Sequence, residues 1–241
     1  SKLDPILVRR AEVYRVKGMG FDPHIGTQVF EPVLAKAKAN NWEPAVTAFA
    51  YAPLAMEAVK TISYEIHEQL GAPDAVFVPV GGGGLFAGIH KGFAELQAEG
   101  SLARLPRMAA CQSAGCANLA NAWTQGLDKP LPGGSTSLIS GIQVPSPPDA
   151  DLVFAALKES RGFANALQDE DTWHWQERLA ADEGIFCEPA GAIGLAGAAK
   201  AARDGMIGKE DNVVIVISGA GFKDVQRIRT MTESAQVPFI E

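Results

Sequence analysis

The chain has 241 residues, a formal net charge of −7 and a hydrophobic fraction of 47%. This length can bury a core without disulfide or metal cross-links, and the acidic balance argues against nucleic acid or an anionic membrane as a partner. Three irregularly spaced cysteines exclude a disulfide framework or a zinc site and favour a reduced, cytoplasmic setting, while the longest apolar run, residues 75–80, is too short to span a membrane.

Short β-branched runs alternate with helical stretches, a pattern typical of an α/β protein with a parallel sheet. In chain order, strands are expected over residues 12–16, 45–49, 75–80, 108–112, 163–167 and 213–217. Helices are expected over residues 26–40, 54–70, 85–96, 118–123, 149–160, 169–183 and 189–203. The strands at 75–80 and 213–217 are continuously apolar, which predicts burial on both faces. The Pro-, Gly- and Ser-rich residues 130–148 are predicted to form a long loop.

The first chemical feature is the run Gly81, Gly82, Gly83 and Gly84, between a buried strand and a helix. Glycines let the backbone approach a ligand closely, and the following helix directs free N–H groups to the same point, so an anion site is predicted. The alternative is a tight turn that needs glycine only for packing. A phosphate of a P-loop nucleotide is disfavoured because no Gly-Lys-Ser/Thr follows. NAD is disfavoured because the next strand does not end in an acidic residue.

Two further features lie near the end of the chain. Ser218 begins a second glycine-containing loop after the last strand, where its hydroxyl either bonds a ligand or caps a local turn. Glu188 precedes Pro189 at the expected start of a helix and is either an acid of the helix N-terminus or a site residue. The small residues that follow allow close helix packing, which is the preferred interpretation of Gly194 and Gly197.

Four stretches, in this order, resemble the tryptophan-synthase-β-like superfamily of pyridoxal-phosphate (PLP) enzymes, and within it the threonine-synthase-like branch. They are Glu57-Ala58-Val59-Lys60-Thr61, Val78-Pro79-Val80-Gly81-Gly82-Gly83-Gly84-Leu85, Gly184-Ile185-Phe186-Cys187-Glu188-Pro189-Ala190 and Ser218-Gly219-Ala220-Gly221-Phe222-Lys223-Asp224. The resemblance implies that Gly81–Gly84 and Leu85 hold the cofactor phosphate. It also implies that Ser218 bonds the pyridine nitrogen and that Glu188 lies near the cofactor.

The same resemblance implies the fold and the domains. Residues 51–241 are expected to form a large cofactor-binding domain, a three-layer αβα structure with a mostly parallel twisted sheet. Residues 1–50 are expected to be the remnant of a smaller N-terminal α/β lobe, so that the chain corresponds to the C-terminal two-thirds of such an enzyme. Two departures put the fine specificity in doubt: Ala58 stands where the family often has Gly, and Ala52-Pro53 replaces a common Asn-Pro pair.

No catalytic residue is identified from the sequence. The Schiff-base lysine and the Ser-Gly-Asn-Thr-type loop of the family are not found and are expected in a missing upstream region. Lys60 and Lys223 are the lysines nearest the motifs, but the family uses neither for this purpose. His90 is predicted to be a partly exposed helix residue and not a base. The chain alone is therefore expected to be inactive.

The resemblance implies PLP-dependent elimination or replacement at the β or γ carbon of a small amino acid. Threonine synthase acting on O-phosphohomoserine is the first choice, and a serine/threonine dehydratase or a diaminopropionate ammonia-lyase is the rival. A non-catalytic fragment or split half that binds an anion or a partner is the alternative from another class. A homodimer and the missing N-terminal segment are the expected partners, and no metal is expected.

Overall fold

A computed structural model describes residues 3–238, apart from the side chains of residues 5 and 27. Its centre is a four-stranded sheet with the order β3-β2-β1-β4, and all three pairings are parallel. The strands are β1 (Ala75–Pro79), β2 (Arg107–Ser113), β3 (Phe163–Leu167) and β4 (Val213–Ile215). The helices are α1 (Asp4–Val8), α2 (Pro23–Ala39), α3 (Pro53–Met56), α4 (Thr61–Leu70), α5 (Gly84–Ala98), α6 (Asn118–Thr124), α7 (Ala150–Glu159), α8 (Asp169–Glu183), α9 (Pro189–Arg203) and α10 (Val225–Thr232).

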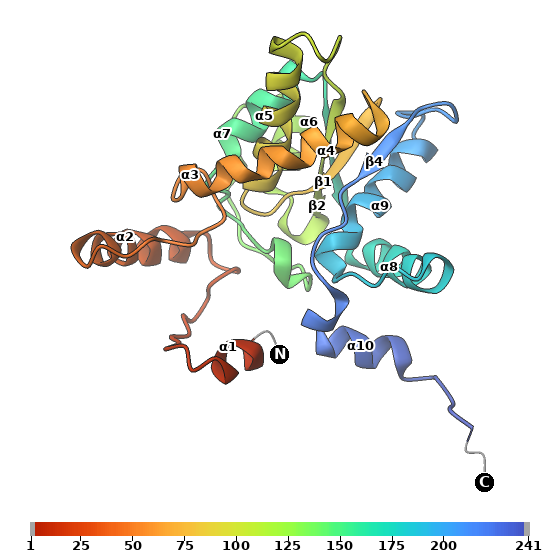
Figure 1. Ribbon diagram of the computed structural model, residues 1–241. Coiled ribbons are helices and arrows are strands. Elements are labelled where there is room, and N and C mark those ends of the chain that lie inside the picture. Colours follow the sequence, from red (N-terminus) through yellow and green to blue (C-terminus); the bar gives the residue numbers. More distant parts are fainter. Residues whose placement is uncertain (1–2, 239–241) are drawn as a thin grey trace.

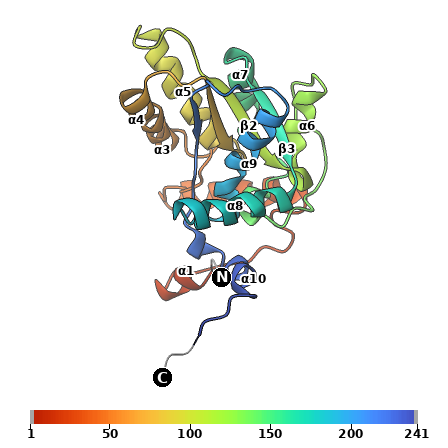
Figure 2. The same cartoon turned by 90° about the vertical axis from the view of Figure 1, so that its right-hand side faces the viewer.

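Helices cover both faces of the sheet, so the predicted three-layer architecture is confirmed (Figure 1). On one face the valines of β1 pack against Phe86, Ile89 and Phe93 of α5. On the other face Phe77 of β1 packs with Ile193 of α9, and α8 lies outside α9 (Figure 2). Successive side chains of a strand point to opposite faces, which explains why β1 is apolar at every position.

Helix α9 lies very close to the sheet because two residues of its inner face are glycines. A Cβ atom on Gly194 would lie 3.2 Å from the carbonyl oxygen of Phe77, and one on Gly197 would lie 2.4 Å from Cys111 Sγ. The prediction that these two glycines serve helix packing is therefore confirmed.

The last strand differs from the prediction in extent and burial. β4 ends at Ile215 instead of residue 217, its residues are half-buried, and Ile217 is 36% exposed. It is an edge strand that pairs with β1 alone among the described residues. The predicted burial of this strand is therefore wrong, because apolar composition carries no information on whether both edges of a strand are paired.

The two strands predicted in the first fifty residues are wrong. Residues 12–16 have no strand partner within the described chain, and Tyr14 is 80% exposed. Residues 45–49 are irregular and end in a turn. The described part of residues 1–50 thus holds α1 and α2 without a strand. Helix α2 begins earlier than predicted because Asp22 accepts a hydrogen bond from His24 N at 2.9 Å.

The helix predicted over residues 54–70 consists of α3, a 3₁₀ segment (Glu57–Lys60) and α4 in succession. Gly71 follows α4 with φ +77°, as expected for a helix-terminating glycine. The other 3₁₀ segments are Ala114–Cys116, Ser140–Ile142 and Gly221–Lys223.

His90 of α5 is buried at 8% exposure, so the prediction of a partly exposed residue is wrong. Burial lowers the pKa of His90 below its ordinary value, and Glu159 of α7, 3.4 Å from Nε2, opposes this to a smaller extent. The folded chain therefore binds fewer protons than the unfolded chain below about pH 6.5. Folding stability should fall as the pH drops through this value.

The measurement is urea denaturation across this pH range for the wild type and for His90→Gln, which should show a shallower decline. His174→Gln, on an exposed position of α8, is the matched control and should keep the wild-type slope. If stability fell equally steeply with pH in the wild type and in His90→Gln, His90 would not be the cause of the decline.

All three cysteines are buried with free thiols. Burial raises the pKa of Cys111 to about 12 and that of Cys187 to about 11, and it also raises the pKa of Cys116. Thiolate is the reactive form, so the native protein should not react with Ellman's reagent at mildly alkaline pH. Three thiols should become reactive in denaturant, and fast reaction of any thiol in the native state would refute this prediction.

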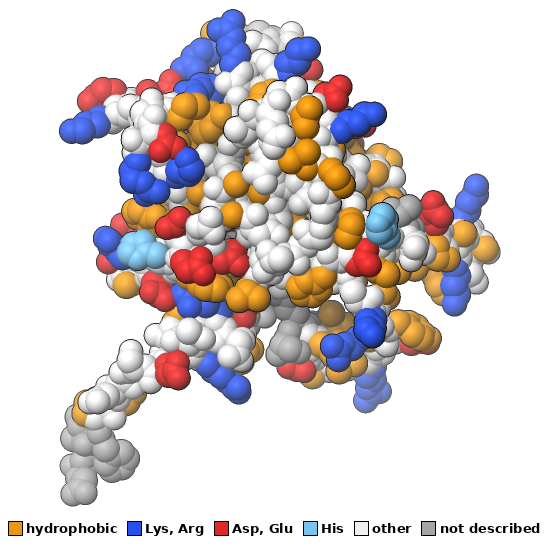
Figure 3. Space-filling view, turned by 180° about the vertical axis from the view of Figure 1, so that it is seen from behind, with side chains coloured by type: hydrophobic (Ala, Val, Ile, Leu, Met, Phe, Trp, Pro, Cys, Tyr) orange, Lys and Arg blue, Asp and Glu red, His pale blue; other side chains and the backbone are white. Residues whose placement is uncertain are grey.

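Within the described residues, no helix is long and apolar enough to cross a bilayer, and no group of His, Cys, Asp and Glu is suited to a metal ion. On the face shown in Figure 3, acidic side chains lie among basic ones, mostly around the rim. Acidic and basic side chains are therefore mixed on this face.

Candidate functional site

The two glycine loops lie next to each other at the carboxyl edge of the sheet. β1 leads into Gly81–Gly84, and β4 leads into Ser218. These strands are parallel neighbours, with Phe77 opposite Ile215, and Val216 N donates to Phe77 O at 2.9 Å beyond the end of β4. Helices α1, α2 and α10 lie at this same end of the sheet (Figure 1). The predicted neighbourhood of the two loops is therefore present.

The four glycines of the first loop divide into two pairs. Gly83 has φ +101°, and a Cβ on Gly84 would lie 2.7 Å from Met56 Cε and 2.9 Å from Thr47 O, so this buried pair is required for backbone conformation and packing. Gly81 and Gly82 are half-buried, and no described residue accepts a hydrogen bond from their N–H groups. The packing interpretation therefore holds for Gly83 and Gly84, while the N–H groups of Gly81 and Gly82 keep no acceptor among the described residues.

A cavity of about 400 Å³ lies beside Gly82. One wall comes from α2 and the residues that follow it, including Phe30, Thr47 and Tyr51, and the other comes from the loop that contains Ser140 and Gln143. The rings of Phe30 and Tyr51 are stacked with centroids 4.8 Å apart. This volume, with an apolar wall and a few polar groups, is typical of a small-molecule site.

The long loop of residues 130–148 was predicted without internal structure, and side chains from the sheet edge hold it in place. Asn118 Nδ2 lies 2.9, 3.1 and 3.0 Å from the carbonyl oxygens of Leu131, Gly133 and Pro145, which share its two N–H donors. Asp169, at the start of α8, accepts hydrogen bonds from Ser137 Oγ and from Leu138 N. The wall of the cavity is therefore ordered by residues outside the loop.

Ser218 and Glu188 are joined through the start of α9. A Cβ on Gly191 would lie 1.9 Å from Ser218 O, and Glu188 N donates to Gly219 O at 3.0 Å. Glu188 occupies the N-cap position of α9 but makes no side-chain cap bond there. Its Oε1 lies 2.2 Å from where a Cβ on Gly219 would be and 3.7 Å from one on Gly141. The structure thus places Glu188 between the second glycine loop and the cavity wall.

Leu85 has a different position from that of the glycines before it. Its side chain is half-buried and packs against the core between the sheet and α5. It is not among the described residues that line the cavity.

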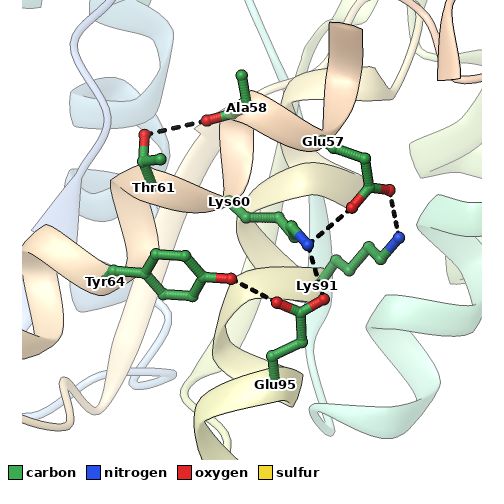
Figure 4. Close-up of polar contacts among 7 residues, drawn as sticks. All are labelled: Glu57, Ala58, Lys60, Thr61, Tyr64, Lys91 and Glu95. Atoms are coloured by element: carbon green, nitrogen blue, oxygen red, sulfur yellow. Dashed lines mark hydrogen bonds and ion pairs between the residues drawn. The ribbon is translucent and has the colours of Figure 1, made fainter. Parts of the chain in front are cut away.

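Lys60 of the Glu57–Thr61 motif is held in an ionic cluster between the 3₁₀ segment and α5 (Figure 4). Its Nζ lies 2.7 Å from Glu57 Oε2 and 2.8 Å from Glu95 Oε1. Lys91 contacts Glu57, and Tyr64 donates to Glu95. Hydrogen bonds to the two carboxylates raise the pKa of Lys60, so its amine stays protonated and is a poor nucleophile. Lys223, the other lysine near a motif, is exposed.

Asp149 contacts both the glycine loop and the segment after α2, and sequence reasoning missed these contacts. It is buried at 3% exposure, and its carboxylate accepts hydrogen bonds from Phe49 N at 2.8 Å and Ala50 N at 2.9 Å. Its own N–H donates to Gly82 O at 3.0 Å. In the sequence, an aspartate just before a helix has the pattern of an N-cap, yet no side-chain cap bond forms here. Nothing in the sequence distinguishes an aspartate that caps its own helix from one that accepts hydrogen bonds from a distant segment.

Comparison with known proteins identifies the family of this chain. A model of the family described as "Pyridoxal-phosphate dependent enzyme" matches residues 10–219. The threonine synthase of Methanocaldococcus jannaschii is 35% identical over 71% of this chain and 43% of its own length. That of Mycobacterium tuberculosis is 34% identical over 77% of this chain and 50% of its own length. The chain thus spans about half the length of these curated relatives.

Solved structures show the same fold. The processed form of threonine deaminase isoform 2 from Solanum lycopersicum has a TM-score of 0.66 at 22% identity, covering 85% of this chain and 56% of its own. Maize serine racemase has a TM-score of 0.59 at 21% identity, covering 77% and 55%. The family model covers most of the chain and the solved structures share its fold, so the chain belongs to the family of pyridoxal-phosphate dependent enzymes.

Proposed function

We propose that this chain supplies the cofactor-binding part of a threonine-synthase-like enzyme that carries out elimination or replacement at the β or γ carbon of a small amino acid. The observation that supports this most is the position of Gly81–Gly82 and Ser218 at the ends of adjacent parallel strands. The open N–H groups of the first loop suit a phosphate, and the hydroxyl of the second suits a ring nitrogen.

The residues present fit PLP. Gly81 and Gly82 would hold the phosphate, because their N–H groups have no acceptor among the described residues and α5 begins directly after the loop. Ser218 would bond the ring nitrogen, and because a hydroxyl can donate as well as accept, it does not force that nitrogen to be protonated. Glu188 would lie beside the same ligand. When bound, PLP supplies an electron sink for carbanion chemistry at the substrate.

The other residues of the site position the ligand and exclude water. The 140–148 loop and the wall that follows α2 enclose the cavity next to Gly82. We propose that the substrate amino acid enters there. No lysine of this chain is assigned to bind the cofactor covalently, since Lys60 is protonated in its ionic cluster and Lys223 is exposed on a 3₁₀ segment.

The proposed domain division places a remnant of the smaller N-terminal lobe in residues 1–50. It places the large cofactor-binding domain in residues 51–241. This division is supported by the described part of residues 1–50, which contains two helices and adds no strand to the sheet. A cytoplasmic location and a homodimer complete the proposal, the first supported by three reduced, buried thiols and the second by the family resemblance.

The test compares two aspartate substitutions. A side chain at Gly82 meets nothing closer than 3.5 Å and needs no positive φ, so Gly82→Asp should fold while placing a carboxylate where the phosphate would bind. PLP binding, measured by equilibrium dialysis, should weaken by at least about tenfold. Gly208→Asp is the matched control, since its Cβ would meet only Asp211, at 3.9 Å, far from the site.

Equal PLP affinity in the wild type and Gly82→Asp, or no binding by the wild type, would refute the cofactor site. PLP binding without turnover of any hydroxylated or phosphorylated amino acid, both in this chain and in the product of its natural gene, would favour the non-catalytic alternative. Borohydride reduction followed by intact-mass measurement should give no stoichiometric adduct at a single lysine of this chain. Such an adduct would overturn the assignment of its lysines.

A further inference from the structure

Asp149 connects the two sides of the cavity through one residue. Its backbone N–H bonds to Gly82 O, which belongs to the glycine loop, and both of its carboxylate oxygens accept peptide N–H groups from residues 49 and 50. Residues 46–48 and Tyr51, which flank that turn, line the opposite wall. Among the described contacts between the glycine loop and residues 46–51, no other contact involves a charged group.

The carboxylate is suited to this role by burial and by charge. It is almost fully excluded from solvent, and an ionised oxygen accepts a peptide N–H more strongly than a neutral one. A Cβ on Gly84 would lie 3.0 Å from Asp149 Oδ2, so the carboxylate also lies against the start of α5. A neutral Asn has nearly the same shape, but its NH2 group would replace one of the two oxygens and would face a peptide N–H that it cannot accept.

We propose that Asp149 is a positioning residue that couples the cavity wall at residues 45–52 to the glycine loop, so that a ligand bound to the loop also orders the wall. The identity of the ligand rests on the proposed function. The coupling itself rests on the three hydrogen bonds of Asp149.

The test is hydrogen–deuterium exchange of the full chain with and without PLP, followed in peptides that cover residues 45–52 and 80–90. In the wild type, PLP should slow exchange in both peptides with one shared apparent Kd. In Asp149→Asn, exchange of residues 49–50 should be about tenfold faster without ligand, and PLP should slow only the glycine-loop peptide. Asp151→Asn, two residues later on the exposed side of α7, should behave as the wild type.

Wild-type exchange at residues 49–50 in Asp149→Asn would overturn the inference, as would ligand-induced slowing of the wall in that variant. Slowing of the loop but not of the wall in the wild type would overturn it without any variant. Absence of slowing in both wild-type peptides would instead refute the proposed cofactor site, while the ligand-free comparison still decides the role of Asp149. If circular dichroism shows that Asp149→Asn is unfolded, Asp149→Glu replaces it, because its longer side chain displaces both oxygens and should uncouple the wall similarly.

Discussion

Gly191→Ala is expected to destabilise the protein by about 3 kcal/mol, near the upper end of the usual cost of overpacking. The new Cβ would lie 1.9 Å from Ser218 O and 2.9 Å from Ser218 C, so it meets backbone and not a flexible side chain. The start of α9 or the end of β4 must therefore move. Because Glu188 N bonds to Gly219 O across this contact, the second glycine loop should move with it. Urea denaturation measures the loss of stability.

Gly26→Ala is the matched control for this substitution. Gly26 also lies in a helix, α2, but its Cβ would have nothing within 4 Å, so alanine should stabilise by up to about 1 kcal/mol through helix propensity. Stability of Gly191→Ala equal to that of the wild type would mean that α9 does not approach Ser218 as closely as described.

The parts of the fold that the sequence predicted correctly are those in which one pattern has one physical cause. β1 is apolar at every position because helices cover both faces of the sheet, and β3 was predicted with its observed bounds. The glycine loop was predicted because residues 81–84 follow a buried strand and precede a helix. In these segments the local pattern and the long-range packing favour the same structure, so the sequence alone predicts the element correctly.

The errors arise where a segment depends on partners distant in the sequence. Residues 45–49 have a β-like composition, but the N–H of Phe49 donates to Asp149, one hundred residues away, and Ala48 N donates to Val46 O, so no strand forms. His90 is buried beside α7, which packs next to α5 on the same face of the sheet, and the helical pattern of α5 alone cannot show this.

The same limit applies to the candidate site. The positions of Gly81–Gly84 and Ser218 relative to each other followed from the rule that parallel strands end at one edge. The cavity wall, the role of Asp149 and the separation of the glycines into an open pair and a packed pair depend on contacts between distant segments, such as Thr47 O with Gly84. No spacing or motif in the sequence encodes these contacts.

Phe77→Ala is expected to destabilise the protein by about 3–5 kcal/mol, the usual cost of removing a fully buried phenyl ring. Phe77 is 0% exposed at the centre of β1 and contacts Phe163 edge-to-face with centroids 5.8 Å apart. A Cβ on Gly197 would lie 3.5 Å from its ring, so the ring fills the space between the sheet and α9. Little else can fill that space, because α9 presents glycine there.

The consequence should extend to the site, because Phe77 lies four residues before Gly81 and its carbonyl oxygen also bonds to Val216 N. If α9 shifts into the space left by the phenyl ring, Glu188 and the second glycine loop should move with it. PLP binding should then weaken along with stability. Phe222→Ala is the matched control: this ring is 76% exposed, and its loss should change stability by less than about 1 kcal/mol. Urea denaturation of both variants decides the matter, and equal effects would show that Phe77 does not fill the interface between β1 and α9.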